Sequence, residues 1–250
     1  MSNMAQFTIA TLGTLSWVLL SHGKIGEYPE PQSYPSNPRR EWFEVLIIFI
    51  LNLGSISYLI YSRYLNDYYY PSIRLLGFPI TLHLVLVFTL PVIIELLLHR
   101  RSLSDLGFRL PLDWKPASAL ILFALVMGWI ASHYDDPDLL GTKTMLWYLV
   151  TPSLSEEWLY RSVLQTKLER LTSIEQSWII SGIFFGLSHI PTDFFGPLWM
   201  ASDMERGTAL LRLFSQITYG WLFGVLYSKS RSIFPGVFAH YLSDFLPYFF

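Results

Sequence analysis

The sequence contains no cysteine and few charged residues. Without cysteine the chain cannot form a disulfide, use a thiol nucleophile or bind zinc through thiolates. Charged residues make up 14% of the 250 positions, whereas soluble domains average about 25%. The net charge of −2 gives no reason to expect nucleic-acid binding. The remaining composition, 52% hydrophobic with a mean hydropathy of +0.38, indicates an integral membrane protein of one domain surrounded by a lipid bilayer.

Long charge-free windows predict the membrane spans. A helix needs roughly 20 apolar residues to cross a bilayer, and no period-2 pattern favours a barrel. We therefore predict an all-α, polytopic bundle of about eight transmembrane helices. The first window is rich in Ser and Thr and could instead be a signal peptide or lie flat on the membrane, although it lacks a basic start and a clear cleavage site. The expected spans are 1–23, 45–62, 75–94, 116–134, 144–171, 176–192, 213–228 and 232–243.

Basic residues are concentrated in alternate connections between these spans. Eleven of the seventeen Lys and Arg residues lie in the connections 24–42, 99–115, 167–175 and 229–231. Short loops rich in Lys and Arg face the cytoplasm. We therefore expect these four connections to be cytoplasmic and both termini to lie outside.

Four ionisable residues lie in or beside the apolar segments, where a charge is costly: Glu156, His189, His240 and Asp244. An ionisable side chain inside a bilayer costs at least a few kcal/mol and is a functional-site candidate by default. Two histidines with two carboxyl groups indicate a site that handles protons, water or a metal. The alternative is a buried polar network that only holds helices together.

The spacing of these residues suggests different tasks. Neighbours on an α-helix point about 100° apart, so Glu156 and Glu157 are not expected to share one task. Glu157 and Arg161 are spaced i,i+4 with the acid first, which favours a structural ion pair and leaves Glu156 free as a general base. His240 and Asp244, also i,i+4, could bind one substrate oxygen or metal together, or hydrogen-bond each other.

Other polar or small residues in the spans have structural interpretations. His83 has no obvious partner in the sequence and is interpreted as a hydrogen-bonded packing residue. Glu44, Glu95 and Arg212 lie near span ends, where they are expected to reach the interface by snorkelling. The small-xxx-small pattern at 220–224 predicts a close contact between helices of the same chain.

Three short motifs occur in a recognisable order. They are Glu-Glu-x-x-x-Arg at 156–161, Phe-x-x-x-His at 185–189 and His-x-x-x-Asp at 240–244. Together they resemble the signatures of the CPBP family, the CAAX-prenyl-protease-2-like and bacteriocin-processing intramembrane endopeptidases, also called Abi proteins. The resemblance assigns 99–250 to the catalytic region, whereas 1–98 resembles the family only in being hydrophobic and is expected to form N-terminal transmembrane helices.

The resemblance implies a glutamate-type intramembrane endopeptidase that acts on membrane-associated, prenylated or propeptide substrates. In that family Glu156 would activate a water, and His189, which follows Phe185 in its motif, would help to position the water. His240 and the residue four positions later would stabilise the oxyanion, while Arg161 would pair with Glu157 as structural support.

The residue at 244 departs from the usual family pattern, which often has Asn there. An ionised Asp244 would repel a developing oxyanion. It must therefore be protonated, which an apolar site can arrange, or must orient His240 by accepting its N–H. We favour the second role.

Three other functions compete with the peptidase. Glu156, His189, His240 and Asp244 could form a zinc site, although no His-Glu-x-x-His helix is present, and we expect no cofactor. The chain could be a non-enzymatic immunity or scaffold protein that only binds a peptide. A proton-coupled transporter ranks last, because no matching pair of broken helices is evident. The expected partner is a peptide or protein substrate in the membrane, and the expected location is the bacterial inner membrane.

Overall fold

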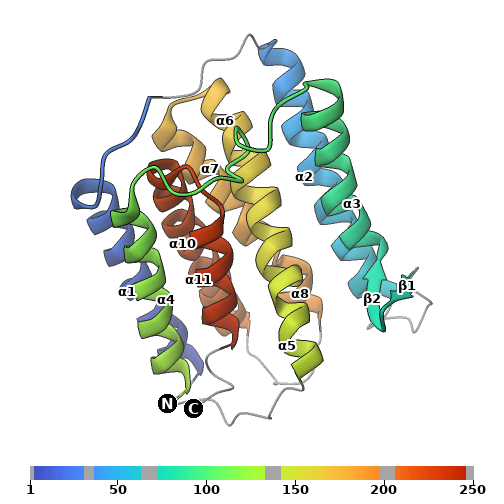
Figure 1. Ribbon diagram of the computed structural model, residues 1–250. Coiled ribbons are helices and arrows are strands. Elements are labelled where there is room, and N and C mark those ends of the chain that lie inside the picture. The colour runs from blue at the N-terminus through green and yellow to red at the C-terminus, as the bar shows by residue number, and fades with distance from the viewer. Residues whose placement is uncertain (1–2, 31–36, 63–71, 133–141, 197–205, 246–250) are drawn as a thin grey trace.

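The computed structural model describes residues 3–30, 37–62, 72–132, 142–196 and 206–245. These residues form a bundle of helices with one short β-hairpin, which confirms the all-α class (Figure 1). Two helices, α2 (Pro38–Ile60) and α10 (Arg206–Ser230), are long and apolar enough to cross a membrane. Further apolar helices are shorter, among them the run Leu82–Leu98, formed by α3 (Leu82–Pro91) and η2 (Val92–Leu98), and most of α4 (Trp114–Ser132).

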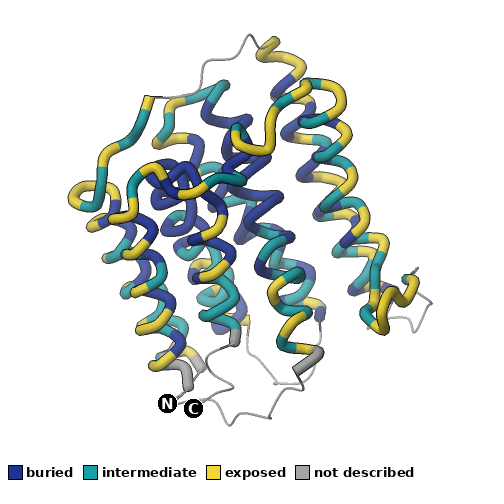
Figure 2. The backbone as a smooth tube through the Cα atoms, viewed as in Figure 1, coloured by how far each residue is buried: buried dark blue, intermediate teal, exposed yellow. Residues whose placement is uncertain are grey.

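A broken helix runs through the middle of the bundle and is called the central helix below (Figure 1). It comprises α5 (Thr142–Tyr148), the π-helical segments η3 (Leu149–Leu154) and η4 (Glu157–Gln165), and α6 (Thr166–Leu171). The break lies at Thr151, whose backbone is extended because the following Pro152 disfavours the helical conformation. Every residue of η4 is buried, and Figure 2 shows this dark-blue core flanked by exposed outer helices.

Helices on two sides enclose the central helix. One side holds α2 and α3, and the other holds α7 (Ile174–Leu187), α10 and α11 (Phe234–Phe245) (Figure 1). α1 (Asn3–Lys24) and α4 complete the outer layer, and the short α8 (Ile190–Phe195) follows α7. The contact predicted from the pattern at 220–224 is confirmed, since a Cβ on Gly220 would lie 2.7 Å from the Cα of Gly182 on α7.

The beginning of the third expected span is a β-hairpin, not a helix. β1 (Ser72–Leu75) pairs antiparallel with β2 (Phe78–Thr81), and Ser72 lies opposite Thr81. Leu76 and Gly77 between the strands both have positive φ, the conformation of a tight two-residue hairpin turn. The side chain of Thr81 then caps α3 by accepting a hydrogen bond from the backbone N–H of Leu84. The predicted helix over 75–94 was therefore wrong at its start.

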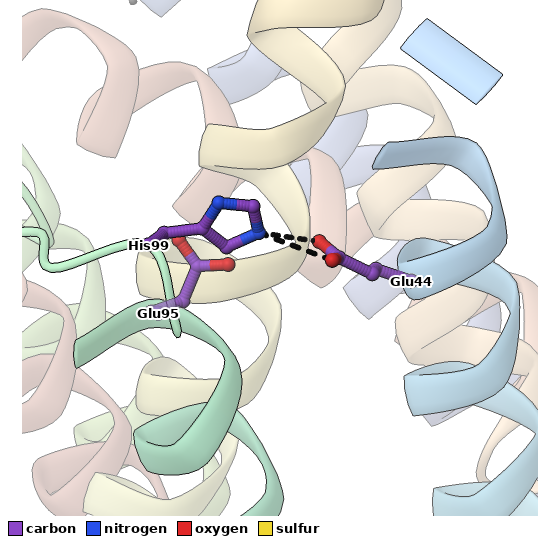
Figure 3. A group of neighbouring side chains, drawn as sticks. All are labelled: Glu44, Glu95 and His99. Atoms are coloured by element: carbon purple, nitrogen blue, oxygen red, sulfur yellow. Dashed lines mark hydrogen bonds and ion pairs between the residues drawn. The ribbon is translucent and has the colours of Figure 1, made fainter. Parts of the chain in front are cut away.

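A group of buried charges joins the N-terminal helices to the central helix. We call it the ion cluster: Glu41, Glu44, Glu95, His99, Arg101, Lys167 and Arg170. The ammonium of Lys167 lies 2.9 Å from Glu41 Oε2, 2.6 Å from Glu44 Oε2 and 2.5 Å from Glu95 Oε1, and its side chain is 0% exposed. Glu44 also accepts a hydrogen bond from the ring of His99 at 2.8 Å (Figure 3).

This cluster corrects the interpretation of Glu44 and Glu95 as snorkelling residues. Both are buried, and Glu95 is also 2.9 Å from Arg101 Nε. Their shared partner Lys167 comes from a helix far away in the sequence, so the carboxylates are neutralised inside the protein and do not need to reach an interface.

Lys229 fixes the end of α1 against α10. Its ammonium donates to the carbonyl oxygens of Ser21, His22, Ile25 and Gly26 at 2.7 to 3.0 Å. The last carbonyls of a helix lack partners within the helix. A cation at this position satisfies them and also matches the helix dipole.

Candidate active site

The imidazole of His240 lies among three carboxyl groups. Its Nε2 is 3.6 Å from Glu156 Oε2 and 3.6 Å from Asp244 Oδ2, and its Nδ1 is 3.5 Å from Glu157 Oε1. These distances exceed those of normal hydrogen bonds, so the interactions are mainly electrostatic. Glu156 and Glu157 lie where η3 gives way to η4, whereas His240 and Asp244 lie on α11. The fold thus brings together three of the four residues expected to form the site, with Glu157 as a fourth member.

The expectation that the two glutamates face separate places was wrong in this respect. Glu156 and Glu157 point in different directions from the helix, but the ring of His240 lies between their directions and presents one nitrogen to each. Glu157 also makes the i,i+4 pair, with its Oε2 3.4 Å from Arg161 Nε. One oxygen of Glu157 therefore faces the histidine and the other faces the arginine.

Arg161 is buried between aromatic rings. Its guanidinium carbon lies 5.0 Å from the ring centre of Phe185 and 5.8 Å from that of Phe223. Cation–π contacts of this kind are strongest where water is excluded. Phe185 from the second motif therefore supports the first motif directly.

Gly236 allows α11 to approach the glutamates. A Cβ at this position would lie 2.5 Å from Glu157 Oε2, too close for any real side chain. Gly236 was not among the residues predicted to form the site. A glycine directly after Pro235 at a helix start, one turn before His240, was the available signal.

His189 lies apart from the three carboxyl groups. Its Nδ1 is 2.8 Å from the carbonyl oxygen of Phe185, so Nδ1 carries the hydrogen and donates it. The ring of Phe185 has its centre 4.8 Å from that of His189 and 6.2 Å from that of His240. Phe185 thus contacts both histidines, and the Nε2 of a neutral His189 is left as the nitrogen able to accept a hydrogen bond.

Two cavities flank the pair formed by Glu156 and His240. One, which we call the arginine cavity because Arg161 and Arg212 line it, has a volume of about 220 Å³. The other, which we call the apolar cavity because most of its wall is apolar, has a volume of about 260 Å³. The arginine cavity is lined by residues that include Glu157, Arg161, Arg212, Tyr219, His240 and Asp244. The apolar cavity is lined by residues that include Asn52, His83, Trp147, Thr151, Glu156 and Tyr160. Glu156 faces one cavity and its histidine partner faces the other, so the pair lies at their boundary.

The polar lining of the apolar cavity was not identified from the sequence. Asn52 on α2 donates to the hydroxyl of Tyr160 at 2.9 Å, one turn after Glu156 on the central helix. His83 is hydrogen-bonded to Ser55 at 2.8 Å, as its interpretation required, but it also lines this cavity. Asn52, an asparagine within an apolar window, was the signal in the sequence for this polar wall of the cavity.

Several buried polar atoms of the site have no hydrogen-bond partner among the described residues. They are Glu156 Oε2, Glu157 Oε1, His240 Nδ1, and Nε and Nη1 of Arg161. More than nine in ten buried polar groups in proteins are hydrogen-bonded, and exceptions need an explanation. Such a concentration of unsatisfied donors and acceptors beside two cavities is suited to polar groups of a substrate.

A group of side chains close enough together to bind a metal ion lies outside the candidate active site. Among the residues that the structure describes, the ligand atoms of Glu44, Glu95 and His99 lie within 4.8 Å of one another (Figure 3). The ammonium of Lys167 is 2.6 Å from Glu44 and 2.5 Å from Glu95, so the place of a cation in this group is taken by the chain itself.

Comparison with known proteins identifies the segment that contains the site. Residues 139–246 match the family model described as type II CAAX prenyl endopeptidase Rce1-like. The comparisons with curated proteins and with solved structures give no match. All three motifs lie inside the matched segment, which confirms the family resemblance drawn from them. Residues 139–246, which hold the site, are therefore similar to the Rce1-like type II CAAX prenyl endopeptidases.

Proposed function

We propose that this protein is an intramembrane endopeptidase in which Glu156 activates the water that hydrolyses a peptide bond. The family match implies a CAAX-type protease, and the glutamate mechanism is our inference from the site. The observation that carries it is the partly buried group of Glu156, His240 and Asp244 at the boundary of two cavities. A carboxylate beside an imidazole can divide proton transfer and charge stabilisation between two side chains.

In the proposed reaction, Glu156 accepts a proton from water as the water oxygen bonds to the scissile carbonyl carbon. The former carbonyl oxygen becomes an oxyanion, and an N–H of His240 stabilises it. The C–N bond then breaks, and Glu156 returns the proton to the leaving amine. One water is consumed, and the products are a carboxylic acid and an amine, which ionise in water to a carboxylate and an ammonium.

The neighbouring carboxyl groups are proposed to hold His240 for this task. Asp244 faces Nε2 and Glu157 faces Nδ1, so both nitrogens of the ring are restrained. An imidazolium formed at His240 would be balanced by the surrounding carboxylates. Arg161 holds Glu157, and we propose that His189 positions the water through its Nε2.

We propose a multi-pass topology of about eight spanning helices in the bacterial cytoplasmic membrane. Besides α2 and α10, other outer helices carry exposed large apolar side chains, among them Leu19 on α1, Leu97 on η2 and Leu122 on α4. Extended apolar surface of this kind is typical of contact with lipid or another protein. The proposed substrate is a peptide or protein held in that membrane, including prenylated or propeptide substrates.

We further propose that the reaction needs no metal. Elemental analysis of the purified protein and activity after chelation test this statement. A stoichiometric metal together with loss of activity on chelation would favour the zinc alternative.

The glutamate mechanism is tested by Glu156→Gln, which keeps the shape of the side chain and removes the base. We expect cleavage to fall by about 10²–10⁴-fold, the usual contribution of a general base. Glu175→Gln, an exposed glutamate on α7, is the matched control and should keep its activity. Comparison of membrane peptides from cells carrying the wild type or Glu156→Gln would identify the substrate.

Retained turnover in purified Glu156→Gln protein would contradict the mechanism. If cells that carry the inactive Glu156→Gln variant keep the wild-type phenotype, the non-enzymatic alternative is favoured.

A further inference from the structure

The basic residues gather at one end of the bundle. At this end, called the basic end below, α1, η2, α6 and α10 finish and α2, α4, α7 and α11 begin (Figure 1). It carries Lys24, Arg39, Arg40, Arg100, Arg101, Arg109, Lys115, Lys167, Arg170, Lys229 and Arg231. At the opposite end, where α1 begins and α11 finishes, the described connections and helix starts carry Arg74, Lys143 and Arg206. Short loops rich in Lys and Arg stay in the cytoplasm, so the basic end faces the cytoplasm.

Both cavities at the site lie in the half of the bundle away from the basic end. The arginine cavity is lined by residues from the first half of α1, the first half of α10 and the last turn of α11, among them Phe7, Arg212 and Ser243. The apolar cavity is lined by the second half of α2, the start of α3 and the hairpin, among them Leu59 and Thr81. These elements surround the end of the bundle where α1 begins and α11 finishes (Figure 1).

The route from the basic end to Glu156 is filled with protein. Lys167 follows Glu156 by eleven residues on the central helix, about 16 Å at 1.5 Å per residue. Buried side chains such as Val163 and Leu164 occupy the helix between them. Between the central helix and α2 and η2, a substrate would also have to separate the ion cluster, and breaking a buried ion pair costs several kcal/mol.

We propose that the substrate reaches Glu156 from the non-cytoplasmic face of the membrane, so that the protein cleaves peptides that have already left the cytoplasm. This inference rests on the proposed peptidase function and on its membrane topology. A peptide made in the cytoplasm must first be translocated across the membrane to reach the non-cytoplasmic face, so the cleavage follows a translocation step. The substrate class is then an exported peptide or the exported part of a membrane-anchored protein.

The absence of cysteine makes the wild-type chain a ready background for labelling single cysteines. Gly207→Cys places a thiol at the exposed start of α10, where its Cβ would be in ordinary contact with Met4 Cε at 3.8 Å, and Ser243→Cys places one in the wall of the arginine cavity. Ser104→Cys places the matched control at an exposed position on the basic end. Bacterial cells expressing each full-length variant are treated with a membrane-impermeant maleimide before and after permeabilisation.

We expect Gly207→Cys and Ser243→Cys to be labelled in intact cells, and Ser104→Cys to be labelled only after permeabilisation. The inference is overturned if Ser104→Cys is the variant labelled in intact cells, or if Ser243→Cys stays unlabelled there. Cleavage by purified protein in detergent, where both faces are accessible, separates the two proposals. If the enzyme is active but the labelling is reversed, the proposed function holds and this inference is contradicted. If the wild type is inactive but the labelling is as expected, the proposed function is contradicted and the accessible face of the site is still established.

Discussion

Lys167 is the residue whose removal should be most costly outside the site. Its ammonium contacts three buried carboxylates at 2.9, 2.6 and 2.5 Å and has no exposure to solvent. Lys167→Met keeps most of the side-chain volume and removes the charge. Removing one partner of a buried ion pair typically costs about 3–5 kcal/mol, because the other partner is left uncompensated.

The remaining partners of the three carboxylates place the loss at the lower end of this range. Glu41 keeps Arg101 and Arg170, Glu44 keeps Arg40 and His99, and Glu95 keeps Arg101. We therefore expect a loss of about 3 kcal/mol. At about 2–4 °C per kcal/mol for a chain of this size, the unfolding midpoint should fall by about 6–12 °C.

Thermal unfolding of the purified protein in detergent, followed by circular dichroism, measures this change. Lys115→Met, at an exposed lysine, is the control and should leave the midpoint unchanged. Adding Glu95→Gln to Lys167→Met should restore part of the loss, because it removes a buried negative charge that has lost Lys167 and keeps Arg101 as its nearest cation. A Lys167→Met midpoint equal to that of the wild type would refute the electrostatic argument, and so would strictly additive losses in the double variant.

Three further changes test local contacts. Gly236→Ala should lower cleavage while the protein stays folded, because its Cβ displaces the carboxylate of Glu157, whereas Gly54→Ala, with open space around it, should leave cleavage unchanged. Gly220→Ala should lower the free energy of unfolding by about 1–3 kcal/mol, measured by denaturant unfolding, because a methyl group there overpacks the crossing with α7. Lys229→Met should speed amide hydrogen exchange at the end of α1, since it removes the donor to four carbonyl oxygens.

The motifs predicted most of the site because each one fixes a local geometry. The i,i+4 spacing of His240 and Asp244 places both on one face of α11 in any helix, and the same holds for Glu157 and Arg161. The spacing could not show that α11 would turn His240 between the two glutamates. That arrangement depends on how closely the helices approach, and therefore on Gly236.

Other features depend on partners that no sequence window contains. Hydropathy treats Glu44 and Glu95 as charges at span ends, since their common partner Lys167 is more than 70 residues away from each. The hairpin at 72–81 was hidden for a different reason. Its eight strand residues are mostly apolar and run directly into α3. The mean hydropathy of a window of helical length is therefore high across the whole segment and does not reveal the turn.

Residues that support the site from neighbouring helices lie outside the segment that matches the family. The matched segment 139–246 holds every proposed catalytic residue, but Asn52 and His83 of the apolar cavity and all three carboxylate partners of Lys167 lie outside it. Asn52 contacts the central helix at Tyr160, one turn from Glu156, and the ion cluster contacts it again at Lys167. Two contacts to neighbouring helices at different heights fix how a helix is rotated about its axis. The helices before residue 99 therefore determine where Glu156 points, even though the proposed catalytic region, 99–250, supplies the chemistry.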